Sequence, residues 1–156
     1  MSSELQKDAP VLIVGGGPVG MTMALCMAKR GIASVLVEMR TADALPDVKC
    51  NHIASRSMEL FRSLGISQDL RAAGLPDDYP HDVSYRTSTL GEEIARIHIP
   101  GRSTRLTDHS GPDGNWPTPE PPHRLNQRYI EPILRRHVQK QALITCLHRH
   151  QVMAFS

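Results

Sequence analysis

Runs of apolar residues and helical spacings divide the first forty residues into a strand, a helix and a second strand. The uninterrupted apolar run at residues 11–14 predicts a strand that is buried on both faces of a parallel sheet, and residues 34–37 predict a second one. Between them a helix is expected from about Val19 to Arg30, because Gly31 is a favourable residue just past a helix end. This order predicts a βαβ unit.

Residues 55–74 carry the spacing of two further helices. Met58, Phe61 and Leu64 recur at three-residue steps in a helix that is expected to end at Gly65. A short helix is expected over residues 67–73. We interpret the apolar positions of this segment as packing positions.

The middle of the chain alternates apolar and polar residues, which is typical of strands. Residues 83–87 and 94–99 predict an antiparallel strand pair that is linked near Leu90 and Gly91. Residues 101–122 are too rich in proline and glycine for a helix or a central strand, so they predict a loop.

The last part of the chain predicts one helix and one strand. The helix is expected to begin near Arg128, because Pro132 is tolerated only near a helix start. Residues 142–156 alternate loosely and predict a final strand. The chain is therefore expected to be an α/β protein with an inserted antiparallel strand pair.

Three glycines follow the first strand with the spacing G-x-G-x-x-G. Gly15 permits a tight turn, Gly17 permits close approach of the backbone to a pyrophosphate, and Gly20 permits close packing of the helix on the sheet. Glu38 closes the second strand at about the offset of a carboxylate that binds ribose. The alternative is an ordinary βαβ unit with glycine turns, but the full structural context favours binding of an adenine dinucleotide.

Composition narrows the class of protein. The chain has 156 residues and a formal net charge of +2, with no long basic run, so we do not expect a nucleic-acid partner. We expect no membrane span, because no apolar stretch is long enough, and the N-terminus lacks the layout of a signal peptide. Three widely spaced cysteines indicate reduced thiols and a cytoplasmic location. His148 and His150 lack a third ligand, so no metal site is predicted.

The chain resembles the FAD-dependent aromatic hydroxylases, which include the p-hydroxybenzoate and phenol hydroxylases and monooxygenases of aromatic polyketides. The resemblance extends from about Pro10 to Ser156. The order and spacing of its segments make it more specific than the glycine motif alone. Four segments carry the resemblance: VLIVGGGPVGMTMALCMAKRGIASVLVEMR, IASRSMELFRSLGI, YRTSTLGEEIAR and PPHRLNQRYIEPILRRHV.

This resemblance implies a Rossmann-like FAD-binding domain over residues 1–156, with a parallel sheet, flanking helices and an inserted antiparallel strand pair. The later family motifs are absent, so the second half of the FAD site and the substrate domain are expected to lie outside this chain. The implied function is the FAD-binding part of a monooxygenase that depends on NAD(P)H and O2 and hydroxylates a small aromatic substrate, phenolic or polyketide-like. The resemblance is compatible with a homo-oligomer of the full-length protein.

The resemblance also implies which residues bind FAD. Arg40 matches a basic residue near the adenine end, and Gln127, in the pattern Q-x-x-x-E, matches a glutamine near the ribityl and pyrophosphate groups. Lys49 is the nearest match to a basic residue near the phosphates. No catalytic residue is assigned, because the flavin carries the oxygen chemistry. The complete set of expected cofactor residues is Gly15, Gly17, Pro18, Val19, Gly20, Glu38, Met39, Arg40, Lys49 and Gln127.

Two alternatives stay open at this point. The first alternative is a catalytically inactive fragment that binds FAD or ADP. The second is an NAD-dependent dehydrogenase domain. The interrupted βα order after Glu38 disfavours the dehydrogenase. Asn51 and His52 are a departure from the family, because many relatives carry small residues in this loop before the middle helix.

Overall fold

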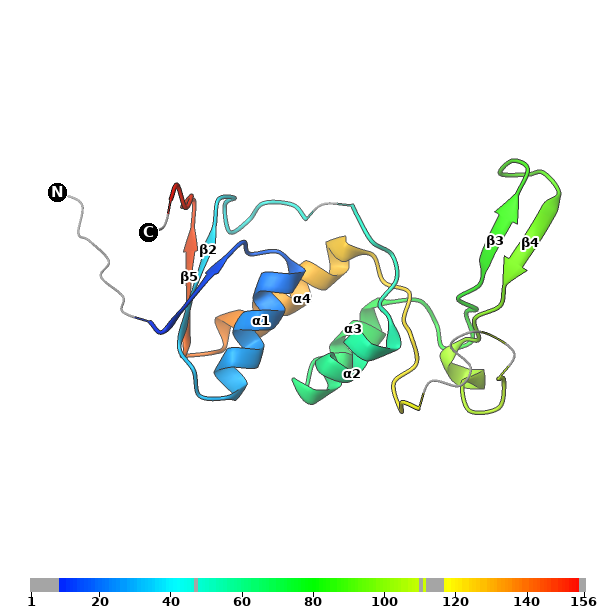
Figure 1. Ribbon diagram of the computed structural model, residues 1–156, viewed down its shortest axis with the longest axis horizontal. Coiled ribbons are helices and arrows are strands. Elements are labelled where there is room, and N and C mark those ends of the chain that lie inside the picture. The colour runs from blue at the N-terminus through cyan, green and yellow to red at the C-terminus, as the bar shows by residue number, and fades with distance from the viewer. Residues whose placement is uncertain (1–8, 47, 110, 112–116, 155–156) are drawn as a thin grey trace. The chain divides into compact units, whose positions relative to one another are not determined.

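The computed structural model describes residues 9–46, 48–109, 111 and 117–154, and its chain forms two compact units (Figure 1). The sheet unit comprises Met1–Lys49 together with Gln127–Ser156. The hairpin unit comprises Cys50–Asn126 and is inserted into the sequence of the sheet unit. The prediction of a single FAD-binding domain over residues 1–156 stays a prediction.

The sheet unit is built around three parallel strands in the order β1-β2-β5. The strands β1 (Val11–Val14) and β2 (Ser34–Glu38) are connected by helix α1 (Pro18–Lys29). Helix α4 (Gln127–Gln139) leads into β5 (Ile144–His148). The predicted βαβ unit and the final helix are therefore confirmed. The final strand, expected over residues 142–156, is shorter than expected: it ends at His148, and the next residue, Arg149, has a positive φ of 61°.

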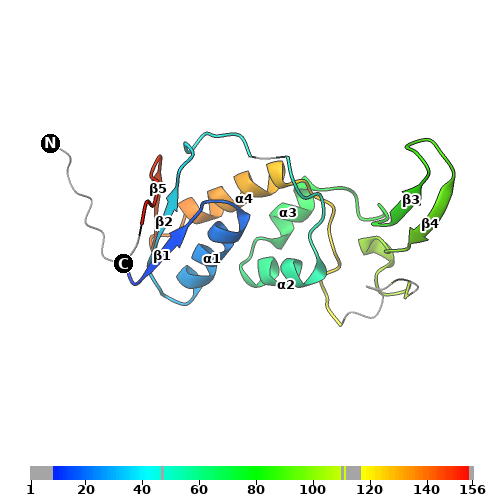
Figure 2. The same ribbon diagram turned by 45° about the horizontal axis from the view of Figure 1, so that its top comes forward.

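Helices α1 and α4 pack against each other and lie on the same side of this sheet (Figures 1 and 2). In β1 and β2, Ile13 pairs with Leu36, and both side chains are buried. Removal of this apolar surface from water is the main stabilising contribution to the unit. Val35 and Val37 of β2 are also buried, and the helices add Met21, Ala24, Leu25 and Ala28 from α1, and Ile130, Ile133, Leu134 and Val138 from α4.

Strand β1 differs from the sequence expectation. Only Ile13 is buried, whereas Leu12 and Val14 are 56% and 62% exposed. The reason is that β1 pairs with β2 alone, and both helices lie on one side of the sheet. In the part of the chain that the structure describes, nothing covers the other side of β1, so the prediction of burial on both faces is wrong here.

The hairpin unit contains the two predicted helices and the predicted strand pair. Helix α2 (Ser55–Ser63) packs against α3 (Ser67–Ala73), and the strands β3 (Val83–Arg86) and β4 (Glu93–Ile97) form an antiparallel hairpin. The predicted loop follows β4 and contains a short 3-10 helix at Arg102–Thr104. Residues 110 and 112–116 of this loop lie outside the described residues.

A buried arginine fixes the end of that loop. Arg71 of α3 donates to the backbone oxygen of Pro122 (3.0 Å), to that of Pro121 and to the carboxylate of Glu120 (2.9 Å). Arg71 and Glu120 are both buried. A charge that is removed from water is tolerated only with such partners. The network therefore ties the proline-rich loop to α3.

Two histidines of the same unit, His81 and His123, are buried. His81 is buried, its ring contacts that of His52, and its Nδ1 has no hydrogen-bond partner among the described residues. Burial, together with the positive charges of nearby His52, Arg124, His123 and Arg71, lowers the pKa of His81 to about 4. Burial also lowers the pKa of His123. Both imidazoles are therefore neutral in the folded protein at pH 7.

We expect the stability of the hairpin unit to fall in mild acid. The unfolded chain takes up a proton on His81 near pH 6.5, whereas the folded chain resists it until about pH 4. Stability is therefore fully present above pH 6.5 and is lost as the pH falls from 6.5 toward 4, by about 2 kcal/mol at pH 5 for this group. Urea unfolding at pH 7.5 and 5 measures the loss. The variant His81→Leu should flatten the profile, and an unchanged slope would contradict the assignment.

Candidate functional site

The connection between β1 and α1 is a glycine loop with a defined backbone. Gly15 has a positive φ of 106°, and its N–H donates to the carbonyl of Val37 at 2.8 Å, which anchors the loop to the end of β2. Gly17 precedes the first residue of α1, Pro18, and has no side chain to cap the helix. The first N–H groups of α1 and the positive end of its dipole are therefore suited to an anion.

Gly20 and Gly17 serve different purposes. A Cβ atom on Gly20 would lie 1.9 Å from the carbonyl oxygen of Gly15, so the fold itself requires glycine there. A Cβ atom on Gly17 would meet no protein atom within 4 Å. The protein thus leaves space at Gly17, where the predicted pyrophosphate would approach the backbone.

Glu38, the last residue of β2, is a buried carboxylate at the edge of the glycine loop. Its Oε2 accepts a hydrogen bond from the Gly16 N–H (2.7 Å), and its Oε1 accepts from the backbone N–H and Nε of Arg40 (2.9 and 3.1 Å). Burial alone would raise the pKa of Glu38, but the bonds from Arg40 and Gly16 and the charge of Arg40 outweigh it, so the pKa is lowered. An ionised carboxylate accepts up to about four hydrogen bonds, so the three that the described residues donate leave capacity for about one more, from a ribose hydroxyl group.

Arg40 and Gln127, which come from distant parts of the sequence, are brought together by Glu131. Gln127 donates from Nε2 to Oε1 of Glu131 at 2.7 Å. Oε2 of Glu131 lies 3.6 Å from Nη2 of Arg40. The Nε atom of the same guanidinium group pairs with Glu38. The site residues at the end of β2 and at the start of α4 are therefore connected through one buried carboxylate.

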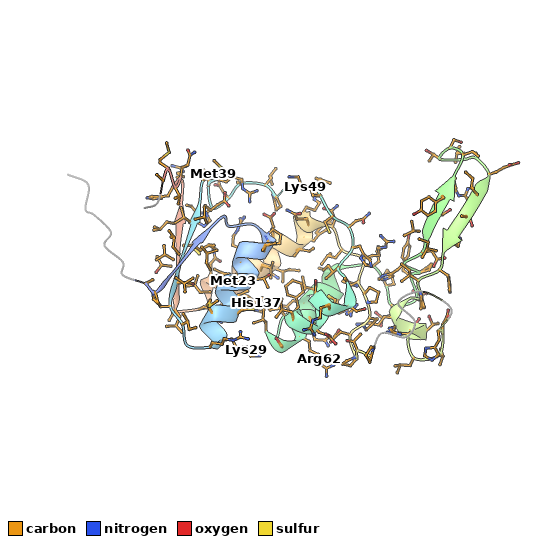
Figure 3. The ribbon with its side chains drawn as sticks, viewed as in Figure 1. Met23, Lys29, Met39, Lys49, Arg62 and His137 are labelled. Carbon is orange, nitrogen blue, oxygen red and sulfur yellow. The ribbon has the colours of Figure 1, made fainter. Side chains whose placement is uncertain are left out.

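The remaining predicted residues surround this arrangement more loosely. Val19 and Met39 are 85% and 64% exposed, and Lys49 is also exposed. Figure 3 shows Met39 beyond the end of β2 and Lys49 further along the loop that follows. The Lys49 backbone oxygen accepts a hydrogen bond from the Gln127 N–H at 3.2 Å. The role of these side chains in cofactor binding stays a prediction.

Two residues of the site were missed by the sequence reasoning. Gly16 lies so close to Glu38 that a Cβ atom on it would be 2.9 Å from the Glu38 Cβ. The signal was the middle glycine of the run at residues 15–17, which the spaced motif does not count. Glu131 was noted only as part of a pattern, although an acidic residue beside Ile130 on the apolar stripe of a helix indicates a buried, partnered charge.

Comparison with known proteins identifies the family. Residues 8–156 match the sequence profile of the family described as FAD binding domain. The chain belongs to this FAD-binding family, and both the resemblance and the predicted α/β fold are confirmed. The dinucleotide that this family binds is FAD.

Two relatives and one solved structure illustrate the similarity. The FAD-dependent monooxygenase apdD of Emericella nidulans is 33% identical over 148 residues, which cover 92% of this chain and 23% of that protein. The 2,4-dichlorophenol 6-monooxygenase of Cupriavidus pinatubonensis is 30% identical over 142 residues, covering 91% of this chain and 22% of that protein. The rebeccamycin biosynthetic enzyme RebC with reduced flavin gives a TM-score of 0.74 at 34% identity, covering 95% of this chain and 26% of RebC. The chain thus spans about a quarter of the length of these proteins.

The residues present fit the adenosine and diphosphate part of FAD. The space at Gly17 accommodates a group that approaches the backbone, and α1 begins there with no acidic residue in its first turn. The carboxylate of Glu38 lies beside the same loop. Among the described residues no helix is both long and apolar enough to cross a membrane.

Proposed function

We propose that this chain is the FAD-binding part of a flavoprotein monooxygenase that uses NAD(P)H and O2 to hydroxylate a small aromatic substrate, phenolic or polyketide-like. The observation that carries the proposal is the glycine loop, with its open space at Gly17 and the carboxylate of Glu38 beside it, in a chain of the FAD-binding family. The names of the relatives, such as 2,4-dichlorophenol 6-monooxygenase, support an aromatic substrate.

The residues of this chain would bind and orient the cofactor. The N–H groups at the start of α1 would bind the diphosphate, and Glu38 would accept hydrogen bonds from the adenosine ribose. Arg40 would lie near the adenine, and Gln127 and Lys49 near the ribityl and phosphate groups. FAD, when bound, supplies electron transfer from NAD(P)H to O2, so that one oxygen atom enters the ring and the other leaves as water. We propose a cytoplasmic location.

The first experiment is a titration of the purified chain with FAD, followed by flavin fluorescence and visible absorbance. We expect saturable quenching with a low-micromolar midpoint and competition by ADP. FMN lacks the adenosine and the second phosphate, so it should bind much more weakly. Binding of NAD without any affinity for FAD would overturn the proposal in favour of a dehydrogenase domain.

A longer protein that includes the substrate domain separates the monooxygenase from the inactive fragment. Its oxidation of NADPH should be stimulated by a phenol, and the product should carry one oxygen atom from O2. A longer protein that binds FAD but oxidises no NADPH with any phenol would favour a nucleotide-binding module without turnover.

The variant Gly17→Ala tests the cofactor loop directly. Because its Cβ would meet no protein atom within 4 Å, we expect the free energy of unfolding to stay within about 1 kcal/mol of the parent. The same methyl group would stand in the path of the pyrophosphate, so the Kd for FAD should rise by at least about tenfold. Fluorescence titration measures the Kd, and an unchanged Kd would show that FAD does not approach Gly17.

A further inference from the structure

Glu131 is a charged residue in an apolar position. It lies in α4 beside Ile130, within the stripe of residues that packs in the sheet unit, and it is 0% exposed. A carboxylate that is removed from water is costly unless it is paired and hydrogen-bonded. Its presence in the core therefore calls for a role that an apolar residue could not fill.

The contacts of Glu131 are with two predicted cofactor residues. Its Oε1 accepts the 2.7 Å hydrogen bond from Nε2 of Gln127, one turn earlier in α4. Its Oε2 lies 3.6 Å from Arg40 Nη2 and accepts no hydrogen bond among the described residues. Arg40 in turn donates to Glu38. One buried carboxylate thus connects the start of α4 with the ribose-binding end of β2.

This connection sets the orientation of Gln127. A carboxylate only accepts hydrogen bonds, so the amide nitrogen of Gln127 must face Glu131. The amide oxygen of Gln127 is then left as an acceptor for a hydroxyl group. For Arg40, the two carboxylates of Glu38 and Glu131 hold one guanidinium group between them, which restricts its rotamers.

We propose that Glu131 is a positioning residue of the FAD site: it holds Gln127 with its amide oxygen directed at the hydroxyl groups of the cofactor, and it holds Arg40 beside Glu38. The proposal rests on the proposed function, in which Gln127 and Arg40 contact FAD. Glu131 itself lies in the core and acts through these two side chains.

The test combines single and double variants of the full chain. In Glu131→Gln the side chain keeps its size but loses its charge, so the amide of Gln127 is free to turn over. We expect the Kd for FAD to rise about tenfold, as when one charge-assisted hydrogen bond is no longer held in place. In the background of Gln127→Ala the same substitution should add clearly less than tenfold, because one of the two side chains through which it acts is gone and only Arg40 remains. The matched control is Asp43→Asn, an exposed carboxylate of the same unit, which should leave the Kd unchanged.

A second measurement uses the protein without cofactor. The side-chain amide signals of Gln127 in 1H–15N spectra should shift in Glu131→Gln, with the fold otherwise retained. Glu131→Asp keeps the charge but shortens the reach to Gln127, so it should also shift these signals and weaken FAD binding, even if Glu131→Gln does not fold.

The outcomes separate the two proposals. Suppose that the parent binds FAD tightly. Additive losses in the double variant, or Gln127 signals that do not move, would then overturn the positioning role and leave the proposed function standing. Failure of the folded parent to bind FAD would overturn the proposed function, and the positioning role with it.

Discussion

The variant Gly20→Ala is expected to lose about 3 kcal/mol or more of folding free energy, with the loss confined to the sheet unit. The added Cβ would lie 1.9 Å from the carbonyl oxygen of Gly15, a backbone atom that cannot swing away as a side chain would. Overpacking of this kind commonly costs about 1–3 kcal/mol, and the contact here is with rigid backbone. At an open helical position the same substitution would stabilise the helix by roughly 1 kcal/mol, so the prediction is opposite in sign to helix propensity.

Urea unfolding followed by circular dichroism measures the loss, and hydrogen exchange locates it in β1 and α1. Gly17→Ala is the control, because it adds the same methyl group three residues earlier, in open space. If both variants were equally stable, close packing of α1 on the glycine loop would not be the reason for Gly20.

The variant Arg71→Met should destabilise the hairpin unit by about 3–5 kcal/mol, the cost of breaking a buried ion pair by removing one partner. Arg71 is buried, and its guanidinium satisfies Glu120 and the backbone oxygens of Pro121 and Pro122. Methionine fills much of the volume but leaves two carbonyl groups without their donor, and among the described residues it leaves the Glu120 carboxylate with only the longer ion pair to Arg62, at 3.8 Å. The expected result is a lower urea midpoint and faster hydrogen exchange in α3.

Two further variants show whether the charge is the cause. Arg56→Met removes an arginine whose side chain is 82% exposed and pairs with Glu59, so it should change stability by less than about 1 kcal/mol. The double variant Arg71→Met with Glu120→Met should recover part of the loss, because the buried carboxylate that has lost its hydrogen-bonded partner is also removed. If Arg71→Met alone cost no more than Arg56→Met, the network would not hold the loop.

The local elements of this chain were predictable because local rules decide them. Helix α3 ends before Gly74, α2 is followed by Gly65 with a φ of 75°, and the strand pair turns near Leu90 and Gly91, as their sequences indicate. The glycine motif and Glu38 were predictable for a different reason. Backbone geometry fixes both the spacing of the loop and the offset of the carboxylate.

The features that the sequence did not predict depend on contacts between distant residues. The exposure of Leu12 and Val14 follows from the side of the sheet on which α1 and α4 lie, which periodicity within β1 does not encode. The link from Arg40 to Gln127 through Glu131 joins residues about ninety positions apart. The depressed pKa of His81 likewise arises from neighbours elsewhere in the unit.

The chain leaves and re-enters the sheet unit at a single point, where the Gln127 N–H donates to the Lys49 oxygen at 3.2 Å. The placement of helix α4 and strand β2 within the sheet unit therefore does not depend on the length of the chain that connects them. We therefore expect the sheet unit to tolerate insertions, deletions and exchanges in residues 50–126, as at other sites where domain insertion succeeds. A protein engineer can therefore exchange residues 50–126 between relatives as one cassette, with the sheet unit left as it is.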